Sequence, residues 1–461
     1  MKVQSKMLRC AVVCVAFTLA AVACGSSSSE QAAPESTVEQ RTTEDTSNAA
    51  EAVATTTSTT TTTSTTPAEV PVLTGAQVLA NDDFTQFAGM RVGLIAHQNS
   101  VVQSGHLLDA IADSPNVELA ALFGPEHGVR GDADAGVYVD NAVDPSTGAT
   151  VFSLFGPTRQ PTPAMLADVD VLFYDLQDVG ARYYTYISTM GLAMQAAAEA
   201  GIPFVVLDRP NPLGGQVGGG LMLAANTSFV GQYEIPDVYG LTSGELARFI
   251  VDNNALSGIS GLDLSVIELV GWDHSIAWDG VGLDWIPPSP AIVSPEAALL
   301  YPATIYFEST NLSYGRGTEI PFQIVGAPWL DAVGVADELN ARGLPGVRFS
   351  ATTMTPQMLA GMTIEPAYLG QSLPAVQLEV TDSAVIRSAE VGVHLLEVVF
   401  ADAETSGVDP LSRPAWMDQL SGSAVLREGL INGVDAASIV GQQQASIESI
   451  TAALDAARLY E

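Results

Sequence analysis

Polar and charged side chains follow four short apolar stretches of the sequence, each typical of a buried strand. In an open parallel sheet, ligands bind outside the carboxyl ends of the strands, because loops converge there and helix N-termini point their dipoles into the same space. The residues that end these stretches therefore predict a polar cleft along one sheet edge. They are His97-Gln98-Asn99-Ser100, Gly124-Pro125-Glu126-His127-Gly128, Gln177-Asp178-Val179-Gly180-Ala181-Arg182 and Asp208-Arg209-Pro210-Asn211-Pro212.

Glu126 is the leading candidate for acid–base chemistry. Gly124 and Pro125 force a turn directly after an apolar stretch, and Gly128 leaves room for a ligand to approach the backbone. A carboxyl group that is partly withdrawn from water in such a turn can serve as a general acid. The alternative is a structural glutamate that caps the turn. His127 either contacts the substrate or only orients the loop.

Asp178 and Arg182 flank a glycine at the predicted start of a helix and are followed by tyrosines, including Tyr184. Aromatic faces stack on sugar rings, and arginine holds carboxylates with two parallel hydrogen bonds. An internal Asp–Arg ion pair with tyrosines in the core is an equally good interpretation. The same two interpretations apply to Asp208 and Arg209, where the following Asn-Pro-Leu-Gly-Gly turn slightly favours the structural one.

A second group of polar residues comes later in the chain. Glu308 follows residues 304–307, which are predicted to form a strand, and Asn311 and Arg316 come shortly after it. Glycines on both sides of Arg316 would let its guanidinium meet a ligand closely. These residues would complete a site between two domains, although a Gly-Arg-Gly sequence taken alone is more often a simple turn.

The sequence also excludes several kinds of chemistry. No cysteine or lysine follows Cys24, which excludes a cysteine nucleophile, a Schiff base and a P-loop lysine. No G-x-G-x-x-G motif follows a strand, and the five histidines lack metal-ligand spacing. We therefore expect neither a dinucleotide nor any other cofactor, and no metal site.

The balance of charge argues against nucleic acid as a partner. Only Lys2, Lys6 and Arg9 of the 17 basic residues precede Cys24, which leaves 14 arginines against 52 acidic residues in the rest of the chain. Such an acidic protein is repelled by phosphate backbones and by anionic membrane surfaces. The sequence carries no signal for a particular oligomeric state.

The N-terminus is typical of an exported lipoprotein. The apolar run over residues 11–23 follows basic residues and is too short to span a bilayer, as in a signal peptide. Ala21-Val22-Ala23-Cys24-Gly25 resembles a lipobox, with Ala21 where leucine is more usual. We expect removal of residues 1–24 as a signal peptide and lipidation of Cys24, so that only this anchor meets the cell membrane. An ordinary cleaved signal is the alternative.

Residues 25–72 are rich in Ser and Thr and too poor in large apolar residues to fold. They are expected to form a disordered tether between the anchor and the folded body. The body should face the cell wall.

Strands and helices are expected to alternate after the tether. Apolar runs at 92–96, 117–123, 169–176, 204–207 and 264–269 predict strands, residues 184–200 predict a helix, and Thr242-Ser243-Gly244-Glu245 resembles a capping box that starts another. This alternation predicts an α/β fold, with a Rossmann-like domain and a mostly parallel sheet over 73–299. A smaller α+β domain over 300–461 would complete the cleft and end in a helix over 445–459.

Four of these motifs together resemble those of the NamZ-like exo-β-N-acetylmuramidases. They are residues 123–132, 175–186, 207–212 and 314–317, and the resemblance runs from about Arg91 to the C-terminus. It implies a Rossmann-like domain, a smaller C-terminal domain and a cleft for a terminal N-acetylmuramic acid, with Glu126 as the main catalytic candidate. The first loop departs from the family's Asn-x-Thr-Gly, since it is His97-Gln98-Asn99-Ser100 here.

On this basis we expect Glu126 to protonate the glycosidic oxygen, while Glu308 or Asp178 activates water or stabilises the oxocarbenium-like transition state. Catalysis by the acetamido group of the substrate would replace that second carboxylate. The lactyl carboxylate needs a cation. The expected substrate contacts are His97, Asn99, His127, Arg182, Tyr184, Asp208, Arg209, Asn311 and Arg316, with one of the three arginines as that cation.

The rival hypothesis is a surface lipoprotein that binds muropeptides or sugars without cleaving them. Both hypotheses predict the same cleft. Replacing Glu126 with glutamine separates them, because only an enzyme would lose turnover while keeping its affinity.

Overall fold

The computed structural model describes residues 71–131, 141–359 and 365–461. The chain divides between Thr66 and Pro67, and the second unit contains all the described residues. The predicted signal peptide, Cys24 and nearly all of the predicted tether lie outside the described residues. None of the helices in the described part is long and apolar enough to cross a membrane.

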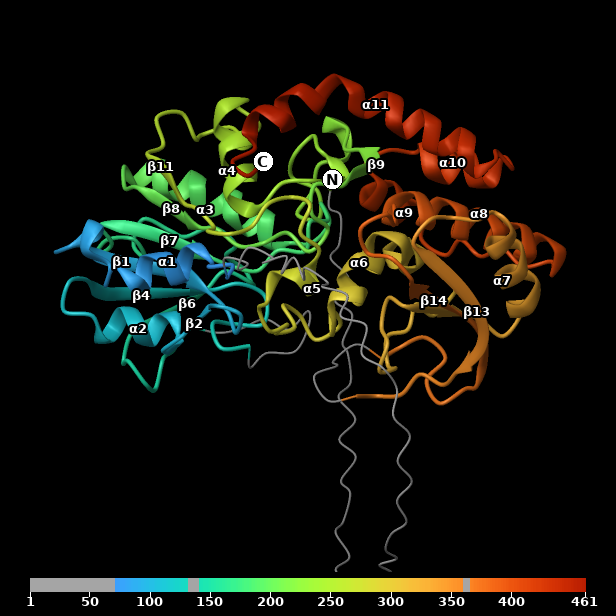
Figure 1. Ribbon diagram of the computed structural model, residues 1–461, viewed down its shortest axis with the longest axis horizontal. Coiled ribbons are helices and arrows are strands. Elements are labelled where there is room, and N and C mark those ends of the chain that lie inside the picture. Colours follow the sequence, from blue (N-terminus) through green and yellow to red (C-terminus); the bar gives the residue numbers. More distant parts are fainter. Residues whose placement is uncertain (1–70, 132–140, 360–364) are drawn as a thin grey trace, which may run out of the picture. The chain divides into compact units, whose positions relative to one another are not determined.

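A seven-stranded sheet forms the N-terminal half of the described body (Figure 1). Its neighbouring strands all run parallel except for the last pair, β6 and β5. This confirms the predicted α/β fold with a mostly parallel sheet. The strand order is β11 (Leu264–Ile267), β8 (Phe204–Leu207), β7 (Val171–Asp175), β1 (Arg91–Ala96), β4 (Glu118–Gly124), β6 (Thr150–Ser153) and β5 (Ala142–Val143).

Helices cover both faces of this sheet because the central strands are apolar on both sides. Phe173 of β7 packs with side chains of α1 (Gly75–Asn81) and α2 (Leu107–Asp113). Its neighbour Tyr174, on the opposite face, packs with α3 (Tyr186–Ala200) and α4 (Ser243–Asp252). The period of two along a strand sends successive side chains to opposite faces. Burial on both faces explains the continuous apolar runs.

Short elements connect the main ones on this side of the molecule. Val101–Val102 and Gly105–His106 pair as a small hairpin, as do Val217–Leu221 and Pro236–Tyr239. The remaining elements are η1 (Thr85–Phe87), η2 (Ala224–Asn226) and α5 (Trp278–Val281), and the hairpin strands are β2, β3, β9 and β10 in chain order.

The C-terminal half contains a three-stranded antiparallel sheet and several helices. The sheet order is β12 (Ile324–Gly326), β14 (Leu373–Val380) and β13 (Val347–Met354). The helices are α6 (Pro295–Thr304), η3 (Ile305–Ser309), α7 (Ala332–Ala341), α8 (Ser388–Thr405), α9 (Pro414–Ser421), α10 (Val425–Ile431) and α11 (Ala436–Ala457). This half corresponds to the predicted smaller α+β part.

Two details differ from the sequence prediction. Residues 304–307 are not a strand: they end α6 and enter η3, and Thr304 Oγ1 donates to the Leu300 carbonyl one turn earlier at 3.0 Å. A short apolar run buried on all sides does not distinguish a strand from a helix. The last helix also begins earlier in the chain than predicted, at Ala436 and not at residue 445, because Asp435 caps it by accepting from Ser438 N. The predicted boundary between residues 299 and 300 falls inside α6.

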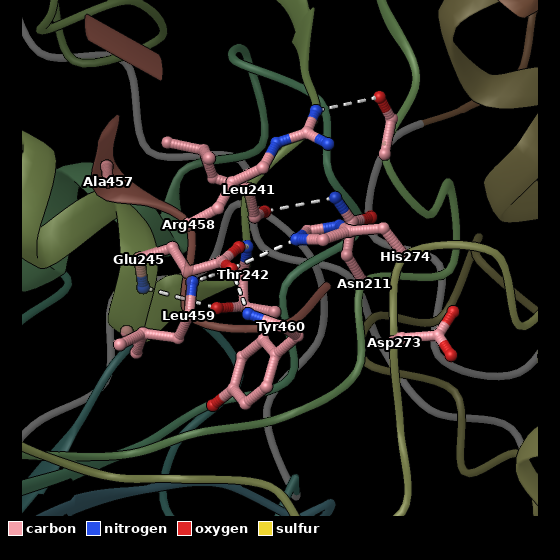
Figure 2. A network of polar contacts seen from close by, with 12 residues as sticks. Asn211, Leu241, Thr242, Glu245, Asp273, His274, Ala457, Arg458, Leu459 and Tyr460 are labelled. Atoms are coloured by element: carbon pink, nitrogen blue, oxygen red, sulfur yellow. Dashed lines mark hydrogen bonds and ion pairs between the residues drawn. The ribbon is translucent and has the colours of Figure 1, made fainter. Parts of the chain in front are cut away.

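The C-terminal tail is bound to α4 through Glu245 (Figure 2). The predicted capping box is present, with Thr242 N donating to Glu245 Oε2 at 2.9 Å. The other carboxylate oxygen accepts from His274 Nε2 at 3.0 Å and from Leu459 N at 2.7 Å. Tyr460 then donates its hydroxyl to Asp208 at 2.7 Å. These bonds fasten the end of the C-terminal half to the N-terminal sheet.

Candidate active site

A hollow beside Glu126 brings residues of both halves together. Its empty space, counted together with the open solvent at its mouth, is about 510 Å³. Aromatic side chains make up much of its wall. It is lined by Glu126, His127, Tyr183, Tyr184, Thr185, Tyr186, Ser289, Ala291, Ile292, Tyr301, Arg316 and Phe322.

Glu126 enters this hollow from a tight turn at the carboxyl end of β4. His127 has a φ of 75° and Gly128 one of 79°, so both lie in the left-handed region. A Cβ on Gly124 would lie 3.3 Å from Gly128 Cα, a tight contact that would require the turn to shift slightly. Thr185 donates its hydroxyl to Glu126 Oε2 at 3.3 Å. The carboxyl group therefore has a side-chain partner that orients it toward the hollow.

Tyrosines of the loop before α3 and of the start of α3 form part of the wall of the hollow. The rings of Tyr184 and Tyr186 meet edge to face at 4.9 Å, and Tyr183 meets Tyr301 of α6 in the same way at 5.3 Å. Burial raises the pKa of each of these phenols well above its ordinary value. They are therefore neutral at physiological pH, and their rings offer apolar faces against which a sugar can pack.

Arg316 supplies a cation to the hollow from the C-terminal half. Its Nε donates to the Tyr314 hydroxyl at 2.9 Å, and its Nη2 lies 3.4 Å from Glu308 Oε1. The other oxygen of Glu308 accepts from Trp416 Nε1 at 3.2 Å. The guanidinium also lies over the ring of Phe322, 5.3 Å from its centroid. Glu308 thus holds Arg316 in place.

Asp178 lies behind the tyrosine wall and does not line the hollow. It is buried, and it accepts from Gly180 N at 2.7 Å and from the hydroxyl of Tyr239. Burial raises the pKa of Asp178 to about 6, against the opposing effect of these hydrogen bonds. This carboxyl group holds together the loop that carries the tyrosines.

Two of the predicted substrate-binding arginines have buried carboxylate partners. Arg182 is fully buried and pairs with Asp237. Arg209 donates two hydrogen bonds to Asp175, at 2.6 and 2.9 Å. Both arginines therefore form structural ion pairs, but their partners are Asp237 and Asp175 and not Asp178 and Asp208, the acidic residues that the sequence had suggested.

Asp208 is likewise bonded within the protein. It accepts from Thr242 Oγ1, Gly244 N, Arg209 N and Tyr460 OH. Burial raises the pKa of Asp208 to about 6. These contacts place it in the junction between the sheet, α4 and the C-terminal tail.

The three remaining predicted contacts also lie outside this hollow. His97 is fully buried, its Nδ1 accepts from Asn99 N at 3.2 Å, and burial lowers its pKa well below the ordinary value. Asn99 lines a different hollow. Asn311 donates to the Asp409 carbonyl at 3.0 Å. Of the predicted site residues, the structure thus brings together Glu126, His127, Tyr184 and Arg316 around one hollow.

Sequence reasoning missed part of this wall. Thr185 lies inside a motif that was singled out, but its contact with Glu126 follows from the turn geometry of two loops. Ser289 belongs to the Pro-rich segment over residues 285–290, whose prolines interrupt the strand–helix pattern and were the available signal. Tyr301 lies within α6 and had none. Among the described residues, no group of three or more His, Cys, Asp or Glu side chains could hold a metal ion.

Comparisons with known proteins agree with this architecture. The family model described as "Exo-beta-N-acetylmuramidase NamZ, N-terminal" matches residues 92–296, and the corresponding C-terminal model matches residues 299–460. The chain is 38% identical to the peptidoglycan beta-N-acetylmuramidase NamZ of Bacillus subtilis (strain 168), over 84% of this chain and 91% of that protein.

Two crystal structures of DUF1343 family proteins from Bacteroides fragilis NCTC 9343 have the same fold. One is 37% identical, with a TM-score of 0.78 over 85% of this chain and 100% of the other. The second is 29% identical, with a TM-score of 0.71 over 85% of this chain and 99% of the other.

Proposed function

The chain belongs to the NamZ exo-beta-N-acetylmuramidase family and is a glycoside hydrolase, and we propose that it releases terminal N-acetylmuramic acid from peptidoglycan fragments. One observation carries this proposal: Glu126 and Arg316, from opposite halves of the body, line one hollow whose wall is largely aromatic. A carboxyl acid, a cation and apolar ring faces are what a sugar with a lactyl carboxylate requires.

Glu126 is the general acid in this proposal. It donates its proton to the glycosidic oxygen as the bond to the leaving sugar breaks. The hydrogen bond from Thr185 Oγ1 to Oε2 holds this carboxyl group at the hollow. His127, in its left-handed turn, fixes the direction in which the neighbouring glutamate points.

Arg316 is the residue that binds the lactyl carboxylate. Arg182 and Arg209 already have buried carboxylate partners, whereas the contact of Arg316 with Glu308 is longer, at 3.4 Å, and its side chain is 28% exposed. A substrate carboxylate can therefore share this guanidinium with Glu308. The position of the charge would select muramic acid over an unsubstituted N-acetylglucosamine.

We further propose that the substrate's own acetamido group, rather than a second protein carboxylate, meets the charge that develops at the anomeric carbon. Among the described residues that line the hollow, Glu126 is the sole carboxylate. Glu308 is engaged with Arg316 and Trp416, and Asp178 lies behind the tyrosines. In this mechanism both act as positioning residues.

The test measures release of N-acetylmuramic acid from a chromogenic muramide and from a MurNAc-GlcNAc disaccharide. Glu126→Gln should lower turnover by about 10²–10⁴-fold, the usual contribution of a general acid, and should keep substrate affinity. Glu118→Gln, on an exposed glutamate of the same strand, is the matched control and should keep full activity. A folded parent that binds the disaccharide without cleaving it would support the non-catalytic lipoprotein instead.

We also propose that the enzyme is exported and held at the cell membrane by a lipid on Cys24, facing the wall. The support is the signal-like run and the Ala21-Val22-Ala23-Cys24-Gly25 sequence. Labelling with a radioactive fatty acid should mark the parent and not the Cys24→Ser variant. Equal labelling of both, or none of either, would contradict the anchor.

A further inference from the structure

A second hollow lies at the same edge of the sheet and contains none of the residues that line the Glu126 hollow. Its empty space is about 1160 Å³. It is bounded by the start of the described chain, the β2 strand, and the segment from Trp278 to Ile286. Asn99, Gln177 and Arg209, which follow β1, β7 and β8, form its polar wall.

One short segment separates the two hollows. The backbone carbonyls of Ile286, Pro287 and Pro288 accept hydrogen bonds from Asn99 Nδ2, Gln98 Nε2 and Tyr186 OH in turn, the last two at 2.9 and 2.8 Å. Ile286 lines the second hollow and Ser289 the Glu126 hollow. The segment 286–288 is thus hydrogen-bonded to the loop after β1 and to the first residue of α3. It separates the two hollows at this edge of the sheet.

The second hollow occupies the position in the fold where ligands are expected. The chain runs from β1 outward to β4 and β6, then returns to β7 on the other side of β1. The order of strands reverses between β1 and β7. Crevices outside such a switch point are the usual ligand sites of open parallel sheets, because the two connections leave in opposite directions.

Its polar wall offers hydrogen-bonding atoms that the protein itself does not use. Asn99 is 5% exposed, and its Oδ1 is buried without a partner among the described residues. The side-chain Nε2 of Gln177 donates to the carbonyls of Asp178 and Pro210, which leaves Oε1 as an acceptor for a ligand. Arg209 gives Nε and Nη2 to Asp175, which leaves Nη1. The residues that line this hollow thus carry two acceptors and one donor that other bonds do not use, and a buried acceptor without a donor is costly.

The charge and the remaining wall decide which chemistry fits. Asp175 balances the charge of Arg209, and Asp284 on the rim adds a negative charge, so an anionic ligand is disfavoured. Trp278 supplies an aromatic ring to the wall. Amide and guanidinium groups beside an indole suit a ligand with many hydroxyls and an apolar ring face. An uncharged sugar has this chemistry.

We propose that this hollow is a second saccharide-binding site, which holds N-acetylhexosamine units of a glycan outside the catalytic hollow. Only the choice of an N-acetylated sugar rests on the proposed function. The geometry of the site, with its unused acceptors at the switch point, stands independently of which reaction Glu126 performs.

The probe is a linear tetrasaccharide of N-acetylglucosamine, whose binding to the full chain is measured by titration calorimetry. Val101→Trp fills the hollow from an exposed lining position and removes no polar contact. It should weaken binding at least about tenfold, which is about 1.4 kcal/mol. Asn99→Ala, which removes the unpartnered acceptor, is the second variant. Val333→Trp replaces an exposed valine of α7 with the same bulk and should bind as the parent does.

The same variants are then assayed on a chromogenic muramide, which carries one sugar. We expect Val101→Trp to turn over the muramide within about twofold of the parent, because Val101 lines the second hollow and not the Glu126 hollow. A twofold change corresponds to less than 1 kcal/mol. Unchanged tetrasaccharide affinity in both variants would overturn the proposal. An equal loss of muramide turnover in Val101→Trp would also overturn it, because the hollow would then belong to the catalytic site. A parent that binds the tetrasaccharide but leaves the muramide intact would refute the proposed function and retain this site.

Discussion

The Tyr186 hydroxyl donates a hydrogen bond to the backbone carbonyl of Pro288 at 2.8 Å. The same hydroxyl lies 3.3 Å from the backbone oxygen of Glu126. The first residue of α3 thus joins the segment between the two hollows to the turn that carries the proposed general acid. The position of Glu126 depends on this phenol through the backbone oxygen of the glutamate.

Removing this hydroxyl should therefore slow the reaction as well as weaken the fold. In Tyr186→Phe the Pro288 carbonyl loses its donor, which should lower the free energy of unfolding by about 1–3 kcal/mol. We expect kcat on the muramide to fall about tenfold, since small displacements of a catalytic group are costly, with KM little changed. Steady-state kinetics and urea unfolding measure the two effects.

Tyr233→Phe is the matched control for this prediction. Tyr233 is equally buried and donates to the Ile187 carbonyl of the same helix at 2.8 Å, but it does not line the Glu126 hollow. It should lose similar stability and keep its turnover. Equal effects of the two substitutions on kcat would show that Tyr186 has only a structural role.

Replacing Arg316 with lysine should change which sugar the enzyme prefers. Lysine keeps the charge but loses the planar fork that can serve Glu308 and a substrate carboxylate together. We expect kcat/KM on the muramide to fall about tenfold or more, which is about 1.4 kcal/mol or more. We expect the parent to turn over the matching N-acetylglucosaminide, which has no carboxylate, more slowly, and we expect the substitution to change that rate little. Arg348→Lys, at an exposed position, is the control, and an equal loss on both substrates would count against carboxylate binding.

The sheet was largely predictable because its strands are apolar on both faces and end in glycine, proline or polar residues. Residues 92–96 and 204–207 form strands as predicted. The capping box at Thr242 was predictable as well, since its pattern lies within four residues. The failure at 304–307 came from a segment so deeply buried that its composition was equally compatible with a strand and a helix.

The site was predictable only in part, because sequence spacing does not show where a side chain points. Asp178 and Tyr184 lie in one motif, yet only the tyrosine reaches the Glu126 hollow. Arg182 and Arg316 were equal candidates for the cation. Their difference depends on Asp237, which approaches Arg182 from a strand far along the chain and neutralises it. Such long-range pairings are decided by tertiary packing.

Asp178 should make stability depend on pH between about 4 and 7. Burial raises its pKa in the folded protein to about 6, so the folded state binds a proton more tightly than the unfolded chain. Its contribution to stability is then full below the unfolded pKa and is lost as pH rises through the folded value. Asp178→Asn removes this effect and still offers an acceptor to Gly180 and Tyr239.

Urea unfolding at pH 4 and at pH 7 tests this expectation. From pH 4 to pH 7, the free energy of unfolding of Asp178→Asn should rise by about 1–3 kcal/mol relative to that of the parent. Each tenfold change in proton affinity corresponds to about 1.4 kcal/mol. Asp337→Asn, at an exposed position on α7, should show no such gain. A parent–variant difference that is the same at both pH values would mean that Asp178 stays ionised throughout.

Glu245 should have the opposite pH dependence, although it too is buried. Burial alone pushes its pKa up, but hydrogen bonds from His274, Leu459 N and Thr242 N outweigh burial and leave the pKa below its ordinary value. A carboxyl with a lowered pKa contributes stability above the unfolded pKa and loses it as pH falls through the folded value. Glu245→Gln would place an amide donor among these donors, so we expect a loss of about 1–3 kcal/mol at pH 7.

That loss of stability should become smaller below about pH 4, because the Glu245 carboxylate of the parent is then protonated and loses these hydrogen bonds. Urea unfolding at pH 7 and at pH 3.5 measures it, with Glu428→Gln, an exposed glutamate of α10, as the control. Because Glu245 holds the backbone of the C-terminal tail, hydrogen exchange at Leu459 and Tyr460 should also speed up in the variant at pH 7. Unchanged exchange there, with the same loss of stability at both pH values, would show that Glu245 acts within α4 alone and does not hold the tail.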